Sequence, residues 1–182
     1  MDAWQDPRPH VGEPLALDLL NTEWVQDGEP VDFLHDLAGT ATWLATNGIA
    51  ARPTAAVRGH LVDARAAILG VLTDGSDRRA RRRLNDVLAH GRLRLSLGDD
   101  GAPTRTVDVD DPAWFPAVLA GLDLLDLLRQ RPDRVRRCDH PDCVLWFLDT
   151  SRNGTRRWHS MATCGNRAKA KRHYSRTRAP EG

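Results

Sequence analysis

The 182-residue sequence has no long apolar run and only three cysteines. Its longest apolar stretch, residues 114–128, is interrupted by Asp123 and Asp126 and is too short to span a bilayer. Acidic residues and prolines stand near the N-terminus, where a signal peptide would have a basic and then an apolar segment. We therefore expect a cytoplasmic protein without membrane contact. Three cysteines cannot all pair, which favours metal ligation over disulfides in a reducing compartment.

The sequence also lacks the motifs of the common enzyme classes. It contains no nucleophile motif, phosphate-binding loop or HExxH pattern, and no internal repeat. His35, Asp36, His60 and Asp63 could meet in space, but their spacing matches no catalytic pattern. We therefore predict that the protein is not an enzyme.

Lysine is scarce, and the basic charge is unevenly distributed. Lys169 and Lys171 are the only lysines, and every other basic residue is arginine. Residues 131–182 contain 13 Lys and Arg against 5 Asp and Glu, whereas residues 1–130 contain 13 against 20. The net charge of +1 thus hides a basic C-terminal part, which is typical of proteins with polyanionic partners.

Helical periodicity dominates the first 130 residues. An apolar run at residues 15–22 is a buried helix or a buried strand, between which periodicity cannot decide. Helical spacing of apolar residues and stop signals then predict four helices, with N-caps at Asp32, Thr54, Ser76 and Asp111. Their expected ends are Asn47, Asp74, His90 and Gln130.

Alternating residues predict a β-hairpin near residues 92–110, inside this helical context. The expected fold is therefore mainly α. We predict a helical N-terminal domain with an inserted β-hairpin over residues 1–130. A small zinc-ribbon or treble-clef-like module follows it over residues 131–182 and ends in a basic helix.

Two close pairs of metal ligands stand in the basic part. Their spacing is Cys138-x4-Cys143 and His159-x4-Cys164, which suits a tetrahedral zinc ion held from two turns. A module of about fifty residues with few apolar side chains buries too little apolar surface to be stable without a metal ion or a similar cross-link. Structural zinc contributes about 10 kcal/mol of apparent folding free energy. Four protein ligands leave no position for a reactive water, so we expect one structural Zn²⁺.

Two alternatives stay open at this point. The cysteines could cluster without binding metal, as ordinary buried or surface residues. The fourth ligand could also be His140 or His173 in place of His159.

The segment around Cys164 resembles a known bacterial family. Residues 158–167 read Trp-His-Ser-Met-Ala-Thr-Cys-Gly-Asn-Arg and are similar to the signature of the CGNR zinc finger, which is named after the tetrapeptide found here at 164–167. Phe147, Asp149 and residues 151–153 also resemble that module, which covers about the last 45 residues. This family usually has cysteine where the present chain has His159, an exchange that keeps a competent ligand and makes binding more pH-dependent.

Upstream residues are similar to the ABATE domain that usually precedes this finger. The similarity rests on residues 17–22, the Trp43-Leu44 helix and the Leu84-Asn85 position. Proteins of this kind are described as stress-induced transcription regulators with a nucleic-acid-binding role. The resemblance implies the same for this chain.

The expected nucleic-acid contacts lie on the helix after Cys164 and on the turn before it. Basic side chains follow two stripes of that helix at helical spacing, which suits phosphate contacts. The predicted contact residues are Arg156, Arg157, Asn166, Arg167, Lys169, Lys171, Arg172 and Arg176. Alternatives are a zinc-stabilised protein-interaction module, a solvated tail, or docking of the basic helix on the acidic N-terminal domain or on a partner subunit.

A second candidate site lies at the end of the first apolar run. Asp18, Asn21 and Thr22 are polar residues that could line a small-molecule pocket with a regulatory role. Capping of a helix is the alternative role for these side chains.

Overall fold

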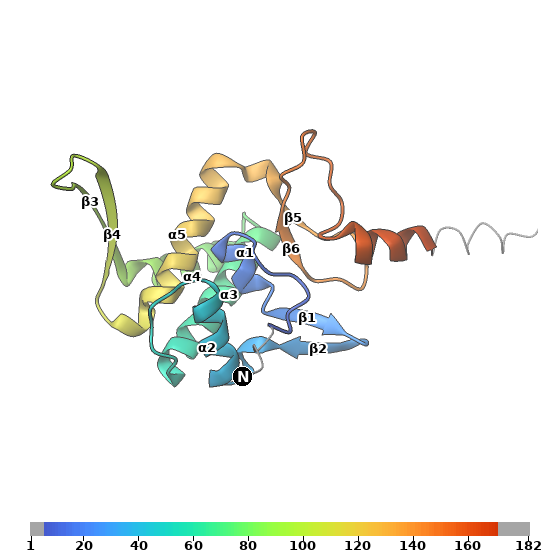
Figure 1. Cartoon of the computed structure of the whole chain (residues 1–182), viewed down its shortest axis with the longest axis horizontal. Coiled ribbons are helices and arrows are strands. Elements are labelled where there is room, and N and C mark those ends of the chain that lie inside the picture. The colour runs from blue at the N-terminus through green and yellow to red at the C-terminus, as the bar shows by residue number, and fades with distance from the viewer. Residues whose placement is uncertain (1–5, 171–182) are drawn as a thin grey trace, which may run out of the picture.

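The computed structural model describes residues 6–170 and is mainly helical, as predicted (Figure 1). The helices are α1 (Leu15–Leu20), α2 (Leu37–Thr46), α3 (Ala55–Thr73), α4 (Arg78–Ala89) and α5 (Phe115–Gln130). The strands form three antiparallel pairs: β1 (Glu23–Gln26) with β2 (Glu29–Asp32), β3 (Gly91–Leu97) with β4 (Pro103–Val109), and β5 (Val135–Arg137) with β6 (Trp146–Leu148). No helix within residues 6–170 is long and apolar enough to cross a membrane.

The helical body is built around α3, which packs against α1, α2, α4 and α5. Its fully buried side chains include Leu61, Ala64 and Ile68, which recur at helical spacing on one face. The helix begins where expected, because the Thr54 side chain accepts a hydrogen bond from the backbone N–H of Val57. The run at residues 15–20 is the buried helix α1, which resolves the helix-or-strand alternative.

Two of the predicted helix starts are wrong. Asp32 caps only a short 3-10 turn, and Asp36 begins α2 by accepting from the Gly39 N–H. Leu37, the first residue of α2, is exposed. Asp77, and not Ser76, caps α4 by accepting from the Arg79 N–H. In each case the helix begins after an aspartate whose carboxylate accepts from a free amide two or three residues on and complements the helix dipole.

The β1–β2 hairpin was not predicted, although its turn has a clear signature. Asp27 and Gly28 connect the strands, and both have positive φ angles of 52° and 90°. Two adjacent positive φ angles are required by the two-residue turn that matches strand twist, for which Asp-Gly is a preferred pair.

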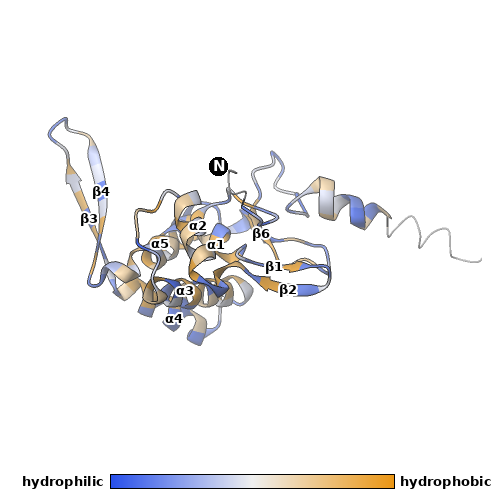
Figure 2. Ribbon diagram, turned by 60° about the horizontal axis from the view of Figure 1, so that its bottom comes forward, coloured by the Kyte–Doolittle hydropathy of each residue, from blue (hydrophilic) through white to orange (hydrophobic). Residues whose placement is uncertain are grey.

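The predicted hairpin near residues 92–110 is present as β3 and β4, and extends from one end of the helical body (Figures 1 and 2). Gly91 begins it where α4 ends, close to Val118 of α5. A Cβ at Gly91 would lie 2.4 Å from a Val118 methyl carbon, so only glycine lets the strand pass this helix.

The C-terminal part is joined to the helical body through a shared hydrophobic core. Cys138, Cys143, Leu145, Trp146 and Cys164 belong to the same buried cluster as the residues of α1 and α3. Strand β6 packs directly against α1. The boundary expected at residue 130 coincides with the end of α5, but the core is continuous across it.

Candidate metal centre and basic surface

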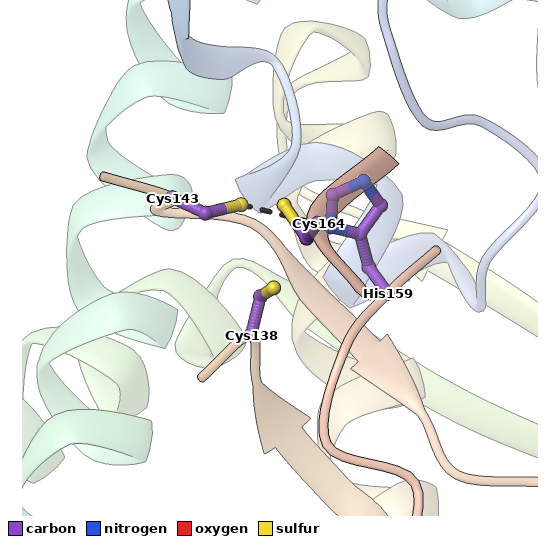
Figure 3. A group of neighbouring side chains, drawn as sticks. All are labelled: Cys138, Cys143, His159 and Cys164. Carbon is purple, nitrogen blue, oxygen red and sulfur yellow. Dashed lines mark hydrogen bonds between the residues drawn. The ribbon is translucent and has the colours of Figure 1, made fainter. Parts of the chain in front are cut away.

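Cys138, Cys143, His159 and Cys164 lie together in the structure, as the sequence spacing predicted (Figure 3). One ligand atom from each residue lies within 4.8 Å of the others, and all four residues are buried. The Nδ1 atom of His159 faces the thiols and lies 3.6 Å from the Cys143 Sγ.

The donor set fits one structural zinc ion. Zinc–sulfur bonds of about 2.3 Å in a tetrahedron place ligand atoms about 3.8 Å apart, so a small contraction of this cluster suffices. Three thiolates and one imidazole would fill the four coordination positions of a tetrahedral structural zinc ion. No coordination position would be left for a water. The chain therefore has a Cys₃His zinc site.

The first ligand pair stands on a tight turn between β5 and β6. Cys138 follows β5 directly, and its backbone N–H donates to the Leu145 carbonyl at 2.9 Å. The N–H of Cys143 donates to the His140 carbonyl at 3.0 Å and closes the turn. Because both ends of the turn are held by backbone hydrogen bonds, the two thiols point to the same side.

His159 is carried by a loop that is shaped around the buried Asp149. This carboxylate accepts hydrogen bonds from the backbone N–H groups of Ser151 at 2.9 Å and Arg156 at 3.0 Å. Burial raises the pKa of Asp149, but these hydrogen bonds and the charge of Arg136 outweigh it and leave the pKa lowered. Asp149 therefore stays ionised and fixes the loop at neutral pH.

The Cys-Gly-Asn-Arg tetrapeptide forms the second half of the site. Ser160 caps a π-helical turn, Met161–Gly165, by accepting from the Thr163 N–H, and residues 166–170 continue as α-helix. A Cβ at Gly165 would lie 2.7 Å from the Met161 sulfur, so a larger residue there would require the exposed Met161 side chain to shift. The Asn166 side-chain amide donates to the Ala162 carbonyl at 3.2 Å and ties the helix to the turn.

Hydrogen bonding controls the ionisation of the cysteine thiols. The hydrogen bond between Cys143 and Cys138 lowers the pKa of Cys138 and raises the pKa of Cys143. The Arg167 guanidinium donates to the Cys164 Sγ at 3.2 Å, and this contact raises the pKa of Arg167. Arg167 thus offsets part of the negative charge that three thiolates bring to the site.

The structure answers which histidine completes the ligand set among the described residues. His140 is buried but lies outside the cluster, and its Nδ1 accepts from the Asp142 N–H at 3.3 Å. His173, the other alternative, lies outside the described residues. His159 is therefore the fourth ligand, and its replacement of the family's usual cysteine preserves the site.

Three of the predicted nucleic-acid contacts prove to have structural partners. Arg156 donates to the backbone carbonyls of Trp158 and His159, and its guanidinium lies 4.7 Å from the centroid of the Phe147 ring. Asn166 and Arg167 support the zinc turn, as described above. The sequence could not show this, because the spacing of residues along the chain does not reveal the partners that they meet in the folded protein.

Three other basic residues are open to a partner. Arg157 is exposed and pairs with the exposed Asp139 at 2.7 Å, an ion pair that solvent weakens. Lys169 and Arg152 are exposed, and neither has an ion-pair or hydrogen-bond partner within residues 6–170. Lys171, Arg172 and Arg176 were also predicted, and they lie outside the described residues.

The small-molecule pocket expected at Asp18, Asn21 and Thr22 is not formed by these side chains. All three residues are at most 1% exposed. Asp18 pairs with Arg8 at 2.6 Å, and the Thr22 hydroxyl accepts from Arg65 at 2.8 Å.

Asn21 instead joins α1 to the zinc module. Its amide nitrogen donates to the Trp146 carbonyl and its amide oxygen accepts from the Trp146 N–H, each at 2.9 Å. The side chain thus replaces a neighbouring strand at the free edge of β6, and the polar end of α1 is part of the fold.

The segment before α1 covers the metal centre, a role that sequence reasoning missed. Glu13 accepts from the Leu148 N–H at 2.8 Å and also bonds the His10 ring at 2.8 Å. The His10 and His159 rings lie 5.0 Å apart. The sequence shows only a Pro- and Gly-containing stretch here, which gives no sign of these long-range contacts.

Comparison with known protein families agrees with this arrangement. Residues 13–131 match the family described as Putative stress-induced transcription regulator (ABATE), and residues 134–177 match the CGNR zinc finger. No curated protein matches the chain. The ABATE match spans well over half of the sequence and is followed directly by the finger that holds the Cys₃His site. The chain therefore belongs to the ABATE family of regulators and carries a C-terminal CGNR zinc finger.

Proposed function

We propose that this zinc-binding regulator contacts nucleic acid through its C-terminal finger. The observation that carries the proposal is the exposure of three basic residues of the finger: Arg152 and Arg157 on the loop before His159, and Lys169 on the helix after Cys164. Residues 161–170, which carry Lys169, project away from the helical body (Figure 1). The described part of the basic helix is thus free for a large partner. Zinc fixes the start of this helix through Cys164, so metal binding and the orientation of the surface are linked.

Binding to labelled mixed-sequence duplex DNA and to single-stranded RNA tests the proposal. Fluorescence anisotropy of the zinc-loaded chain is measured over a salt series, together with a finger variant, Arg152→Gln/Arg157→Gln/Lys169→Gln. For duplex DNA, we expect the slope of log K against log salt to be less steep by about 2–3 in the finger variant than in the wild type. The reason is that each phosphate contact contributes about 0.9 to this slope. Arg167 is left intact because it supports Cys164.

A control variant removes the same amount of charge elsewhere. Arg94, Arg105 and Arg129 are exposed and each pairs with a carboxylate in the N-terminal part. Replacing all three by Gln should leave the salt slope unchanged. Wild-type protein with one zinc that binds neither polymer would refute nucleic-acid contact and favour the protein-interaction alternative. A non-catalytic role remains part of the proposal.

A separate cavity supports ligand sensing by the N-terminal part. A cavity of about 600 Å³ lies between β1–β2, α3 and the β5–β6 pair. It is lined mainly by apolar side chains, among them Leu20, Trp24, Leu69, Val144 and Trp146. This volume and lining are typical of small-molecule sites, which often lie where two parts of a chain meet. A ligand here would contact both the helical body and the zinc module.

The fluorescent probe 1-anilinonaphthalene-8-sulfonate tests the cavity. We expect stoichiometric binding to the zinc-loaded chain, and at least tenfold weaker binding after Leu69→Glu, which places a charge among apolar side chains. An unchanged affinity in a variant with wild-type Tm would refute this site. The exposed substitution Leu125→Glu on α5 is the control.

A further inference from the structure

Helix α4 presents an unusual concentration of positive charge. Arg78, Arg79, Arg81, Arg82 and Arg83 occupy five of six consecutive positions, and all five are exposed. The opposite face of α4 buries Ala80, Leu84 and Val87 in contact with α3 and α5. We name the five residues the α4 arginine cluster. It lies in the part of the chain that is acidic overall, and Figure 2 shows α4 on the surface of the helical body.

Within residues 6–170 none of these arginines forms an ion pair within 4.0 Å, and the only carboxyl whose pKa one of them lowers by its charge is that of the exposed Asp74, near Arg81. Among their side chains, only that of Arg81 makes a hydrogen bond, to the Ser76 carbonyl at 2.9 Å. Some exposed arginines elsewhere are paired, for example Arg105 with Asp126 at 2.8 Å, and others, such as Arg152, are not. What is particular to α4 among the described residues is the density of five exposed arginines without an ion pair in six consecutive positions.

The arrangement does not serve the stability of the helix. Arg78 and Arg79 are the first two residues of α4, where the helix dipole disfavours positive charge. Arg78 and Arg82, like Arg79 and Arg83, are four residues apart, and such like-charged pairs repel each other. A sequence that keeps these costs in an otherwise acidic region indicates an external anionic ligand.

The chemistry of the cluster selects phosphate on a polymer. The planar guanidinium of arginine binds phosphate oxygens in bidentate fashion, and the cluster contains no lysine. Positions 78–83 span about 7.5 Å along the helix axis. A segment of duplex DNA of the same length carries about four phosphate charges. No large apolar side chain is exposed on α4, which argues against insertion into a lipid surface.

We propose that the α4 arginine cluster is a second nucleic-acid-binding surface, which contacts the phosphate backbone independently of the finger. It shares its ligand class with the proposed function but lies on a different element. Figures 1 and 2 both show α4 in the helical body, away from the helix that follows Cys164. A protein with both surfaces contacts more phosphates than the finger alone provides.

The test uses the full zinc-loaded chain with Arg79→Gln/Arg82→Gln/Arg83→Gln. Anisotropy with the same DNA and RNA is compared for this α4 variant, the finger variant and the control variant, each lacking three positive charges. For duplex DNA, we expect the slope of log K against log salt to be less steep by about 2–3 in the α4 variant than in the wild type. Its affinity at low salt should be at least about tenfold lower. Its Tm should equal or exceed that of the wild type, because repulsion within α4 is removed.

The outcomes separate the two surfaces. An α4 variant with the wild-type salt slope, or a control variant that loses as much as the α4 variant, overturns the inference. Loss of binding in the finger variant alone would then leave the proposed function intact. Loss in the α4 variant alone supports the inference and refutes the finger contact. Polyglutamate that displaces DNA from the cluster at equal charge concentration would identify an acidic protein as the ligand and also overturn it.

Discussion

Replacing Asn21 by Ala should destabilise the whole chain, although Asn21 is neither apolar nor a metal ligand. The substitution removes both hydrogen bonds to the backbone of Trp146, each 2.9 Å long and fully buried. It leaves one buried N–H and one buried carbonyl without partners, each at a cost of about 1–3 kcal/mol. The expected loss is about 3 kcal/mol. In a chain of this size it corresponds to a decrease in Tm of about 6–12 °C.

Thermal unfolding followed by circular dichroism of the zinc-loaded protein measures this effect. Asn85→Ala is the matched control, because Asn85 is exposed on α4 and should change Tm by less than about 2 °C. The transfer of zinc to a chromogenic chelator should also be faster in Asn21→Ala. The reason is that β6, which loses its hydrogen bonds to Asn21, follows the turn that carries Cys143. A Tm decrease below about 2 °C, with unchanged zinc transfer, would refute the view that this contact joins the two parts.

Three further predictions follow from the metal centre and its surroundings. His159→Ala should reduce zinc below one equivalent by mass spectrometry, whereas His140→Ala should retain it; the reverse result would exchange their roles. Arg167→Gln should make zinc transfer about tenfold faster, because it removes the hydrogen bond to the Cys164 sulfur; an unchanged rate would leave Arg167 free for nucleic acid. Asp32→Asn should lower Tm at pH 7 because the buried Arg65 loses one of its two carboxylate partners and keeps only Glu23, and this difference should shrink as the pH falls below about 4. The reason is that burial raises the pKa of Asp32 but its hydrogen bonds with Arg65 leave it lowered, so its stabilisation is lost on protonation. A pH-independent difference would contradict this assignment.

The metal ligands were predictable because their chemistry depends on residue type and spacing alone. Two pairs with four intervening residues, in a chain with only three cysteines, leave few other arrangements. The helices α3 and α5 were predictable for a similar reason, since their apolar faces recur over many turns. The pair Asp27-Gly28 is a sequence signal for the β1–β2 hairpin, because Asp-Gly is a preferred pair in two-residue turns. It was overlooked because helical periodicity alone was considered in this part of the chain.

Other features depended on contacts between distant residues and could not be predicted. Asp123 on α5 accepts from the Ala16 N–H at 2.8 Å and so supplies the cap that Pro14 lacks at the start of α1. Burial raises the pKa of this carboxyl, which agrees with its position inside the body. The roles of Asn21 and Arg156 are likewise set by partners that only the folded chain brings near. Polar residues are therefore assigned to function too readily when only the sequence is considered.

The shared core changes how the zinc site relates to the rest of the protein. A finger attached by a flexible linker could lose its metal and leave the helical part intact. Here Cys138, Cys143 and Cys164 lie in the same buried cluster as α1 and α3, and Glu13 accepts a further hydrogen bond from the Leu148 N–H of β6. Loss of zinc would remove the bonds that hold the two ligand pairs together inside this core. Zinc occupancy and the stability of the helical body are therefore coupled. A chelator should lower the Tm of α-helical unfolding in one cooperative transition, and a helical transition unaffected by the chelator would show that the two parts fold separately.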